Sequence, residues 1–298
     1  MRLATFNCEN LFARYKFNKN VDPTKEDGFL IDDTSFDIFD DVEKELTAEA
    51  IKTVNADVIA LMEVESIRVL DLINSKDLKN IGYKEDVIID AHDPRRINVA
   101  VLSKYPIISV KTHRNERSTI PKEIWLFSRD CLEVEIDVDG KSLYLYINHL
   151  KSMMEGRDKT KPRRVEQSQR VAQIIDDKWK DKNYNGNFIV LGDLNDYPDN
   201  DSGIEVLLEH PGLENIITRL PAEEQWTHYW AEKKEYSQLD YIFLSKSLAK
   251  TNTGNPTIMR KGIAKSAVKD TEERFDGVGD TKPVASDHAP VYIDIQLE

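Results

Sequence analysis

The segment "VLGDLNDYPDN", residues 190–200, joins an apolar run directly to a cluster of carboxylates and amides. The apolar run has the length and composition of a buried strand, so we predict a strand over 188–193. Burying an unpaired charge is costly. The strand nevertheless places Asp193 and Asn195 at its end, whereas we interpret Asp196 as part of the following turn. A buried strand that ends in polar side chains indicates a site at the edge of a sheet.

The bulk composition is that of a water-soluble globular protein. The chain has 298 residues, 40% of them apolar and 32% charged. We expect a single domain over 1–298, because sandwiches and barrels of about 200–250 residues occur as one unit. No apolar stretch approaches the ~18 residues of a membrane span, so no membrane association is expected. No secretory signal follows Met1, which predicts a cytoplasmic protein from the sequence as given, or a secreted or periplasmic one if a signal was removed.

The charge is distributed unevenly. The net charge of -13 would argue against a polyanionic substrate. Acids concentrate in residues 18–42, which we interpret as an inserted surface loop, with a lid or a structural Ca²⁺ site at Asp32, Asp33 and Asp37 as alternatives. Residues 151–170 reverse the sign, with seven bases against three acids. This second segment is a candidate phosphate-facing surface.

The cysteines and most of the tryptophans are interpreted as core residues. Cys8 and Cys131 lie in strand-like runs, where a buried free thiol is the default. Trp125, Trp226 and Trp230 could stack on bases, but core tryptophans are the commoner case.

Hydrophobic patterning predicts many strands and few helices. Asp139-Gly140 predicts a tight hairpin, and helices are expected over 43–55 and, beginning at Pro162, over 162–181. The other strands are predicted over residues 2–7, 57–65, 98–103, 131–138, 142–152, 239–245 and 288–296. This element content predicts an α/β (α+β) fold with two packed, mainly antiparallel β-sheets flanked by helices.

Polar groups recur where the predicted strands end. Taken singly, such residues are usually turn formers or satisfied polar groups. Side chains at positions i and i+2 of a strand share a face. We therefore expect Asn7 and Glu9 to point into one site, and likewise Asp193 and Asn195. Carboxylate and amide oxygens suit Mg²⁺ or Mn²⁺ better than zinc. The residues are Asn7 with Glu9, Glu63, His149, Asp193 with Asn195, and Asp287 with His288.

Ordered sequence blocks extend from residue 5 to residue 296 and resemble the signature of the endonuclease/exonuclease/phosphatase superfamily, which includes deoxyribonuclease I and exonuclease III. They are "TFNCENLF", "ALMEVE", "NVAVLSKYPI", "INHLKS", "VLGDLND", "QLDYIFLS" and "SDHAPVYIDI". With the Arg-rich helix that follows "NHLKS", the pattern is most similar to bacterial nuclease-type members. The resemblance implies a four-layered αββα sandwich with its active site at one edge of the two sheets.

The resemblance also implies roles for the metal-binding side chains. Glu63 matches the principal metal ligand of the family. Asn7, Glu9 and Asp287 match residues that complete or approach the metal shell, and the implied ion is Mg²⁺ or Mn²⁺.

The remaining matched residues have catalytic roles in the family. Asp193 matches the residue that positions and polarises the attacking water, and Asn195 the amide that holds this water or a phosphate oxygen. His288 matches the histidine beside the scissile phosphate, and His149 a second histidine that donates to a non-bridging oxygen. Adjacent strand residues point to opposite faces, which makes Asp287 a poor candidate for orienting its neighbour His288. The resemblance implies that Asp240 orients this histidine instead.

Four arginines are candidates for contacting substrate phosphate. Arg129 lies where family members often place such an arginine, and a surface ion pair is the alternative interpretation. Arg163, Arg164 and Arg170 belong to the predicted basic helix, for which a solvated helix face is the alternative.

The leading functional hypothesis is a metal-dependent nuclease that cleaves DNA, with RNA as a further substrate, and acts as a monomer. The alternative within the same chemistry is a phosphatase or phosphodiesterase acting on a small-molecule or lipid phosphoester. A non-catalytic binding module is the alternative from another class, and it is disfavoured because every matched catalytic position holds a competent residue.

Overall fold

Strand β10 (Phe188–Asp193) forms where the sequence predicts it, and all of its residues are buried. Ile189 and Leu191 belong to the hydrophobic core shared by the two sheets. Phe188 and Val190 belong to a separate core with helix α3 (Arg157–Trp179). The strand is therefore covered on both faces, which explains its continuous apolar run.

The computed structural model describes residues 1–13, 15–16, 37–38, 41–267 and 273–297. Strands β2 (Tyr15–Lys16) and β3 (Asp37–Ile38) pair with each other. The predicted insertion at 18–42, including Asp32 and Asp33, lies almost wholly outside the described residues. Only the backbone of Asp37 is described, so the Ca²⁺ hypothesis stays a prediction.

The first sheet has the strand order β15-β16-β1-β4-β6-β5. Its central pair, β1 with β4, is parallel, and the other neighbours are antiparallel. The bounds are β1 Arg2–Leu11, β4 Val58–Val64, β5 Glu85–Ile88, β6 Asn98–Ser103, β15 Thr257–Ile258 and β16 Val291–Asp294.

The second sheet has the order β11-β14-β10-β9-β8-β7 and repeats the same arrangement, with a parallel central pair, β10 with β9. Asp139 and Gly140 both have positive φ and join β8 to β9 in the predicted two-residue hairpin. The bounds are β7 Ile107–Lys111, β8 Cys131–Val138, β9 Lys141–His149, β11 Leu213–Asn215 and β14 Asp240–Ser245.

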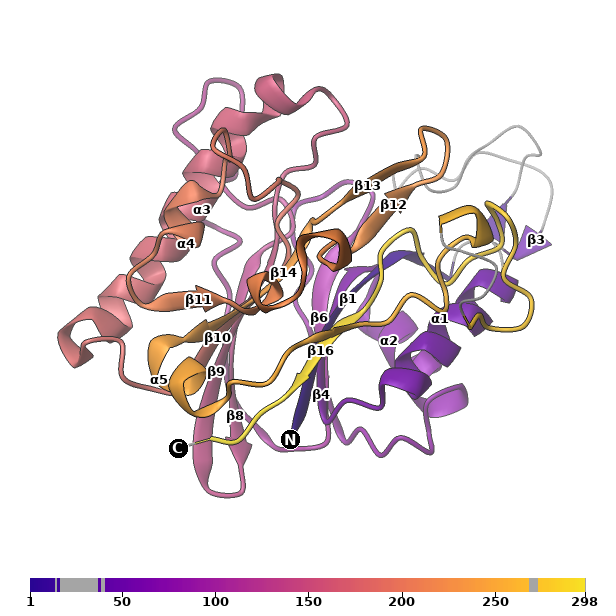
Figure 1. The fold of residues 1–298 in the computed structure, drawn as a ribbon, viewed down its shortest axis with the longest axis horizontal. Coiled ribbons are helices and arrows are strands. Elements are labelled where there is room, and N and C mark those ends of the chain that lie inside the picture. Colours follow the sequence, from indigo (N-terminus) through magenta and orange to yellow (C-terminus); the bar gives the residue numbers. More distant parts are fainter. Residues whose placement is uncertain (14, 17–36, 39–40, 268–272, 298) are drawn as a thin grey trace.

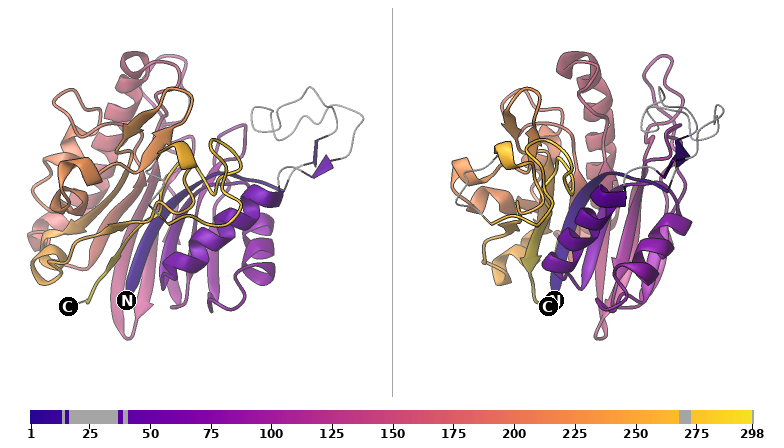
Figure 2. Two further views of the ribbon diagram at one scale, coloured as in Figure 1. Left: turned by 45° about the vertical axis from the view of Figure 1, so that its right-hand side comes forward. Right: turned by 90° about the vertical axis from the view of Figure 1, so that its right-hand side faces the viewer.

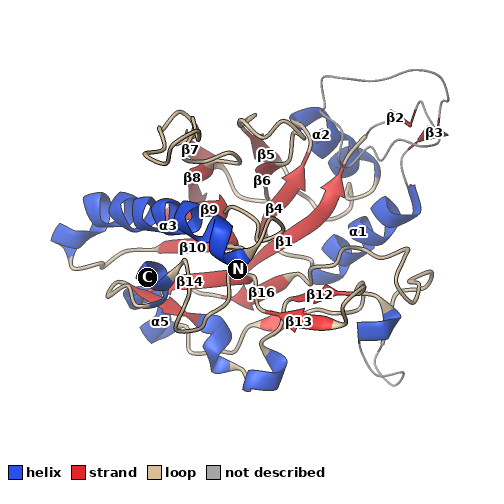
Figure 3. Ribbon diagram, turned by 90° about the horizontal axis from the view of Figure 1, so that it is seen from above, coloured by secondary structure: helices blue, strands red, loops and turns tan. Residues whose placement is uncertain are grey.

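Helices cover the outer faces of both sheets (Figures 1 and 2). Helices α1 (Asp41–Val54) and α2 (Ile67–Lys76) lie on the first sheet, and α3 with α4 (Glu205–Leu208) lies on the second. Figure 3 shows the same layers from above, with α5 (Lys246–Thr251) following β14. The predicted four-layered αββα sandwich is confirmed. No described helix combines the length and the apolar character needed to cross a membrane.

Some elements differ from the sequence prediction. Helix α3 begins at Arg157 rather than at Pro162, which lies inside the helix. Pro162 is the sixth residue of the helix, past its first turn, so it removes the backbone hydrogen bond that this position would otherwise donate to the carbonyl of Asp158. The patterning did not indicate α2, β5, β7, β11 or the hairpin of β12 (His228–Trp230) and β13 (Glu235–Ser237).

Gly192 allows β10 to approach β9 closely. Its φ is +130°, and a Cβ at this position would overlap the backbone carbonyl of Asn148. We therefore expect Gly192→Ala to lower the free energy of unfolding by more than about 1 kcal/mol. Urea denaturation measures this change, and Gly254→Ala is the control because nothing lies within 4 Å of its added Cβ. Equal stability of the two variants would contradict the prediction.

Candidate active site

Asp193, the last residue of β10, has a candidate site residue on each side within its sheet. The parallel register pairs it with His149, and the antiparallel register pairs it with Asp240. In the other sheet, β1 and β4 pair Asn7 with Met62, the residue before Glu63. The central strands of both sheets thus bring predicted site residues to one edge of the sandwich.

The Asp193 carboxylate connects the two sheets. Its Oδ2 accepts hydrogen bonds from Asn7 Nδ2 at 3.0 Å and from Asn195 Nδ2 at 2.9 Å, and its Oδ1 accepts from the Asn195 backbone N–H at 2.9 Å. His149 Nε2 lies 3.4 Å from the same Oδ2. Burial raises the pKa of Asp193 to about 7, although the nearby His288 opposes this shift.

His288 and Asp240 form a buried pair. His288 Nδ1 lies 2.7 Å from Asp240 Oδ2, which also accepts a hydrogen bond from Thr227 Oγ1 at 2.7 Å. Burial disfavours the charged ring, but Asp240 and Asp193 outweigh it and raise the pKa of His288 well above its usual value. The contact predicted between Asp240 and His288 is therefore present, and it leaves Nε2 facing the site.

Positive φ angles interrupt the strands where the site begins. Glu9, Asn10, Glu63 and Asn195 have φ between 45° and 69°. The β1–β4 register shifts after Asn7, so the alternation that was expected to put Asn7 and Glu9 on one face does not hold. Strained backbone of this kind clusters at functional sites.

Glu9 and Glu63 consequently have different surroundings. Glu9 Oε1 pairs with Lys282 Nζ at 2.7 Å, and its Oε2 accepts the backbone N–H of Asp287 at 3.0 Å. Glu63 Oε2 accepts the Asn10 N–H at 3.0 Å, and its Oε1 lies 3.9 Å from His149 Nε2. Burial, and then the charge of Asp287, raises the pKa of Glu63. The Glu9 carboxylate therefore contacts the backbone of Asp287, whereas the Glu9 backbone N–H donates to Asn7 Oδ1 at 3.1 Å.

His228 is a site residue that the sequence reasoning missed. Its Nε2 lies 3.6 Å from Asp287 Oδ2, and its ring centroid is 4.7 Å from that of His288. Its Nδ1 is 2.9 Å from Ser237 Oγ. In the sequence, the histidine itself was the one sign of a site here, because β12 has three residues and is too short to show a strand pattern.

Arg129 is neither exposed to substrate nor part of a surface ion pair. It is 4% exposed, its Nε lies 3.2 Å from Asp93 Oδ2, and its Nη1 donates to the Leu150 carbonyl at 2.6 Å. Its charge limits the rise in the pKa of Glu63 that burial causes, and it adds to the effect of burial in lowering the pKa of His149. Arg129 is therefore a buried charge close to the site.

The structure contradicts both interpretations of Arg163 and Arg164. Arg163 is buried and donates to the carbonyls of Leu126 and Trp125, so it neither contacts phosphate nor lies on a solvated face. Arg164 is completely buried, with its Nε 2.8 Å from Asp196 Oδ2. Asp196 is likewise a buried ion-pair partner and not merely a turn former.

Arg170 is more exposed than the other two arginines of helix α3, but it is also paired. Its guanidinium is engaged bidentately by the carboxylate of Glu116. A guanidinium held in this way is poorly placed to take substrate phosphate, so the structure does not support that prediction for Arg170.

The cysteines agree with the sequence interpretation and the tryptophans do not. Cys8 and Cys131 are free and buried. Trp125 and Trp226 are partly exposed, and Trp230 is 38% exposed. All three side chains therefore border solvent rather than fill the core.

The donor atoms at this edge suit a hard divalent cation. Glu63 and Asp287 supply carboxylate oxygens, and Mg²⁺ and Mn²⁺ prefer oxygen ligands. Ligand atoms of Asp193, Asp240 and His288, and separately of His228, Asp287 and His288, lie within 4.8 Å of one another. Among the described residues, Asn10 Oδ1 and Asp240 Oδ1 are buried without a hydrogen-bond partner. The residues present therefore fit the expected ion.

Solved structures share this fold along the whole chain. A humanized zebrafish (D. rerio) TDP2 matches with a TM-score of 0.61 and 16% identity, covering 99% of this chain and 98% of that one. The human Nocturnin catalytic domain matches with a TM-score of 0.62 and 16% identity, covering 100% and 94%. A Bacteroides thetaiotaomicron mannosyl-6-phosphatase matches with a TM-score of 0.62 and 15% identity, covering 100% of both chains.

No curated protein matches the sequence. The model of the endonuclease/exonuclease/phosphatase family, however, matches residues 2–297. Members of this family are metal-dependent phosphoester hydrolases. The chain therefore belongs to the endonuclease/exonuclease/phosphatase family.

Proposed function

We propose that the chain cleaves phosphodiester bonds of nucleic acid, principally DNA, by metal-assisted attack of water. The position of His288 between two buried carboxylates supports this proposal most directly. Its Nδ1 pairs with Asp240, and its Nε2 lies 4.0 Å from Asp193 Oδ2. A proton donor and a proton acceptor thus face one space, as hydrolysis at phosphorus requires.

Asp193 is the proposed group that holds the attacking water and accepts its proton. Its raised pKa of about 7 suits a base that works near neutral pH. The amides of Asn7 and Asn195 fix the carboxylate before substrate arrives. A carboxylate that is already oriented does not have to reorganise during the reaction, which lowers the activation free energy.

The two histidines are the proposed partners of the phosphoryl oxygens. The carboxylate of Asp240 keeps His288 protonated, so its Nε2–H can donate to an oxygen that gains charge. Burial, followed by the charge of Arg129, keeps the pKa of His149 well below its usual value. A neutral His149 can donate one hydrogen bond without adding charge.

Glu63 and Asp287 are the proposed metal ligands, with Asn7 beside them. When bound, Mg²⁺ or Mn²⁺ would polarise a phosphoryl oxygen and offset its developing charge. Glu9 supports Asp287 through its backbone N–H, and Lys282 balances the charge of Glu9.

The charge of the site favours a diester over a monoester. The nearby cations Lys282, Arg129 and Arg95 are already paired, Lys282 with Glu9 and both arginines with Asp93. A phosphomonoester carries about -1.5 to -2 charges near neutral pH, so the carboxylates of the site repel it more strongly than a singly charged diester. A zebrafish TDP2 with this fold has been solved with a single-stranded DNA product, which supports nucleic acid as the substrate class.

A substrate panel tests the proposal. The protein is incubated with Mg²⁺ or Mn²⁺ and duplex DNA, single-stranded DNA, RNA, abasic DNA or p-nitrophenyl phosphate. We expect cleavage of DNA with a higher kcat/KM than hydrolysis of the monoester. Hydrolysis of monoesters without cleavage of any nucleic acid would establish the phosphatase alternative, which the mannosyl-6-phosphatase with this fold represents. Binding without turnover across the panel would indicate a non-catalytic module.

A further inference from the structure

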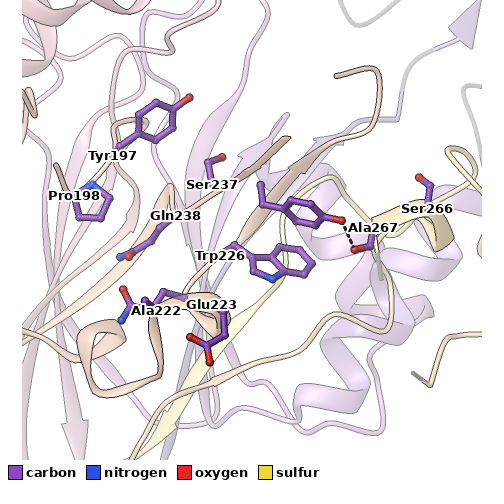
Figure 4. Close-up of a pocket in the computed structure, with 11 residues that line it drawn as sticks. Tyr197, Pro198, Ala222, Glu223, Trp226, Ser237, Gln238, Ser266 and Ala267 are labelled. Carbon is purple, nitrogen blue, oxygen red and sulfur yellow. Dashed lines mark hydrogen bonds between the residues drawn. The ribbon is translucent and has the colours of Figure 1, made fainter. Parts of the chain in front are cut away.

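A large cavity adjoins the candidate active site and has no role in the chemistry described above. Its volume is about 910 Å³, within the range of ligand pockets. Figure 4 shows Tyr197 and Pro198 on one side, Ser266 and Ala267 on the other, and Gln238 and Trp226 between them.

Covalent and hydrogen-bonded links place this cavity next to the catalytic residues. Gln238 precedes Asp240 by two residues, and Tyr197 follows Asn195 by two residues. Ser237 lines the cavity, and its Oγ contacts His228, whose other ring nitrogen faces Asp287. Two side chains, Ser237 and His228, therefore connect the cavity to Asp287, a proposed metal ligand.

Aromatic rings form a supported wall of this cavity. Trp226 and Tyr236 meet edge to face, with centroids 5.0 Å apart. The Arg260 guanidinium lies 4.1 Å from the Trp226 ring centroid, and the Tyr236 hydroxyl donates to the Ala267 carbonyl at 2.7 Å. Rings held in this way offer a stacking surface that does not need to be ordered when a ligand binds.

The Gln238 side chain gives the cavity an unsatisfied polar group. Gln238 is 6% exposed, and neither its Oε1 nor its Nε2 has a hydrogen-bond partner among the described residues. A buried amide without partners is unfavourable, so native structures usually pair it with protein, water or a ligand. The amide offers one acceptor and one donor group, which matches the polar edge of a nucleobase.

The cavity offers a phosphate no cationic partner among the described residues that line it. Glu223 is the only charged residue among the described residues that line the cavity. A flat, uncharged group with a polar edge fits this lining, and a phosphate does not.

We propose that this cavity is a base-binding subsite that takes the nucleobase next to the cleaved phosphodiester. The base stacks on Trp226, and the Gln238 amide hydrogen-bonds to its edge. The inference rests on the proposed nuclease function. It adds that the site binds single-stranded or locally opened substrate, because a base within a duplex is already stacked on its neighbours.

Binding measured in EDTA tests the subsite without cleavage. A short labelled single-stranded oligonucleotide is compared with a base-free oligonucleotide of the same length by fluorescence anisotropy. We expect the normal oligonucleotide to bind about 10-fold more tightly, since stacking on one aromatic residue has roughly this effect. Trp226→Ala should remove the difference, and Trp226→Phe should restore most of it.

Two further variants separate base recognition from stability. Trp230→Ala is the matched control, because Trp230 lies on β12, four residues after Trp226, but is not among the residues that line the cavity. Gln238→Leu removes an amide that bonds to no described residue, so its thermal stability should not fall while its preference for bases does. A loss of stability with an unchanged preference would show a structural role for Gln238 and overturn its assignment.

The remaining outcomes are also decisive. Equal affinity of the wild-type protein for normal and base-free oligonucleotides, or equal effects of Trp226→Ala and Trp230→Ala, would overturn the subsite. Tighter binding of the base-free oligonucleotide would show that the cavity takes a sugar. If the wild-type protein cleaves DNA in the substrate panel and yet shows no preference for bases, only the subsite fails. If it cleaves no nucleic acid, the proposed function fails.

Discussion

His288→Ala is expected to lower kcat for DNA cleavage by at least ~10²-fold, the loss found when a single donor to a developing oxyanion is removed. The reason lies in the pairing of His288 Nδ1 with Asp240 at 2.7 Å, which fixes the ring and keeps it protonated. Alanine removes the proton donor and leaves the Asp240 carboxylate buried. Initial rates of cleavage of a fluorescent DNA substrate in Mg²⁺ measure the effect.

A second buried histidine provides the control for this variant. His210 and His288 are both 7% exposed, and each contacts a carboxylate, but the partner of His210 is Asp176 on helix α3. His210→Ala should therefore keep most of the activity of its folded fraction. Wild-type protein in EDTA gives the baseline without metal. Full activity of His288→Ala would refute the role assigned to this histidine.

Arg164→Ala is expected to lower the free energy of unfolding by about 3–5 kcal/mol, the usual cost of removing one partner of a buried ion pair. Arg164 and Asp196 are both completely buried. The guanidinium also donates to Thr160 Oγ1 at 2.6 Å and to the carbonyls of Lys151 and Arg157. Its removal leaves Arg157, whose Nε lies 2.9 Å from Asp196 Oδ1, as the cation paired with this buried carboxylate, and it takes away the donors to the buried acceptors. Urea denaturation followed by circular dichroism measures the loss.

Lys159→Ala is the matched control on the same helix. The Lys159 side chain is 72% exposed and pairs with Glu155 near the surface, so its replacement should change stability by less than about 1 kcal/mol. Equal stability of the Lys159 and Arg164 variants would mean that the buried pair adds little. A specific loss of substrate affinity in a fully stable Arg164 variant would instead revive the phosphate-binding interpretation.

The central strands could be predicted because their local signals are strong. Strands β6, β8 and β10 were placed to the residue, since each is an apolar or alternating run bounded by turn residues. The Asp139-Gly140 turn fixed one hairpin register. Edge strands such as β5 and β7 were missed because their partial exposure weakens the alternation.

The site was predicted in its composition but not in its geometry. Strand alternation argued only against Asp287 as the partner of His288, and the family resemblance supplied Asp240. The bulge after Asn7 has no sequence signal that would have redirected Glu9. The arginines show a more general limit. A basic helix looks solvated until the distant groups that bury its charges are known, and Asp196 lies 32 residues from Arg164.

The pairing of β1 with β16 sets the order in which the chain can complete its fold during synthesis. Arg2 pairs with Asp294, so one edge of β1 stays open until almost the whole chain has left the ribosome. Open strand edges recruit other chains, and pairing across such a long separation is slow. His288 emerges with the same closing segment. Chains that lack this segment would therefore be prone to aggregation and would also lack the proposed proton donor.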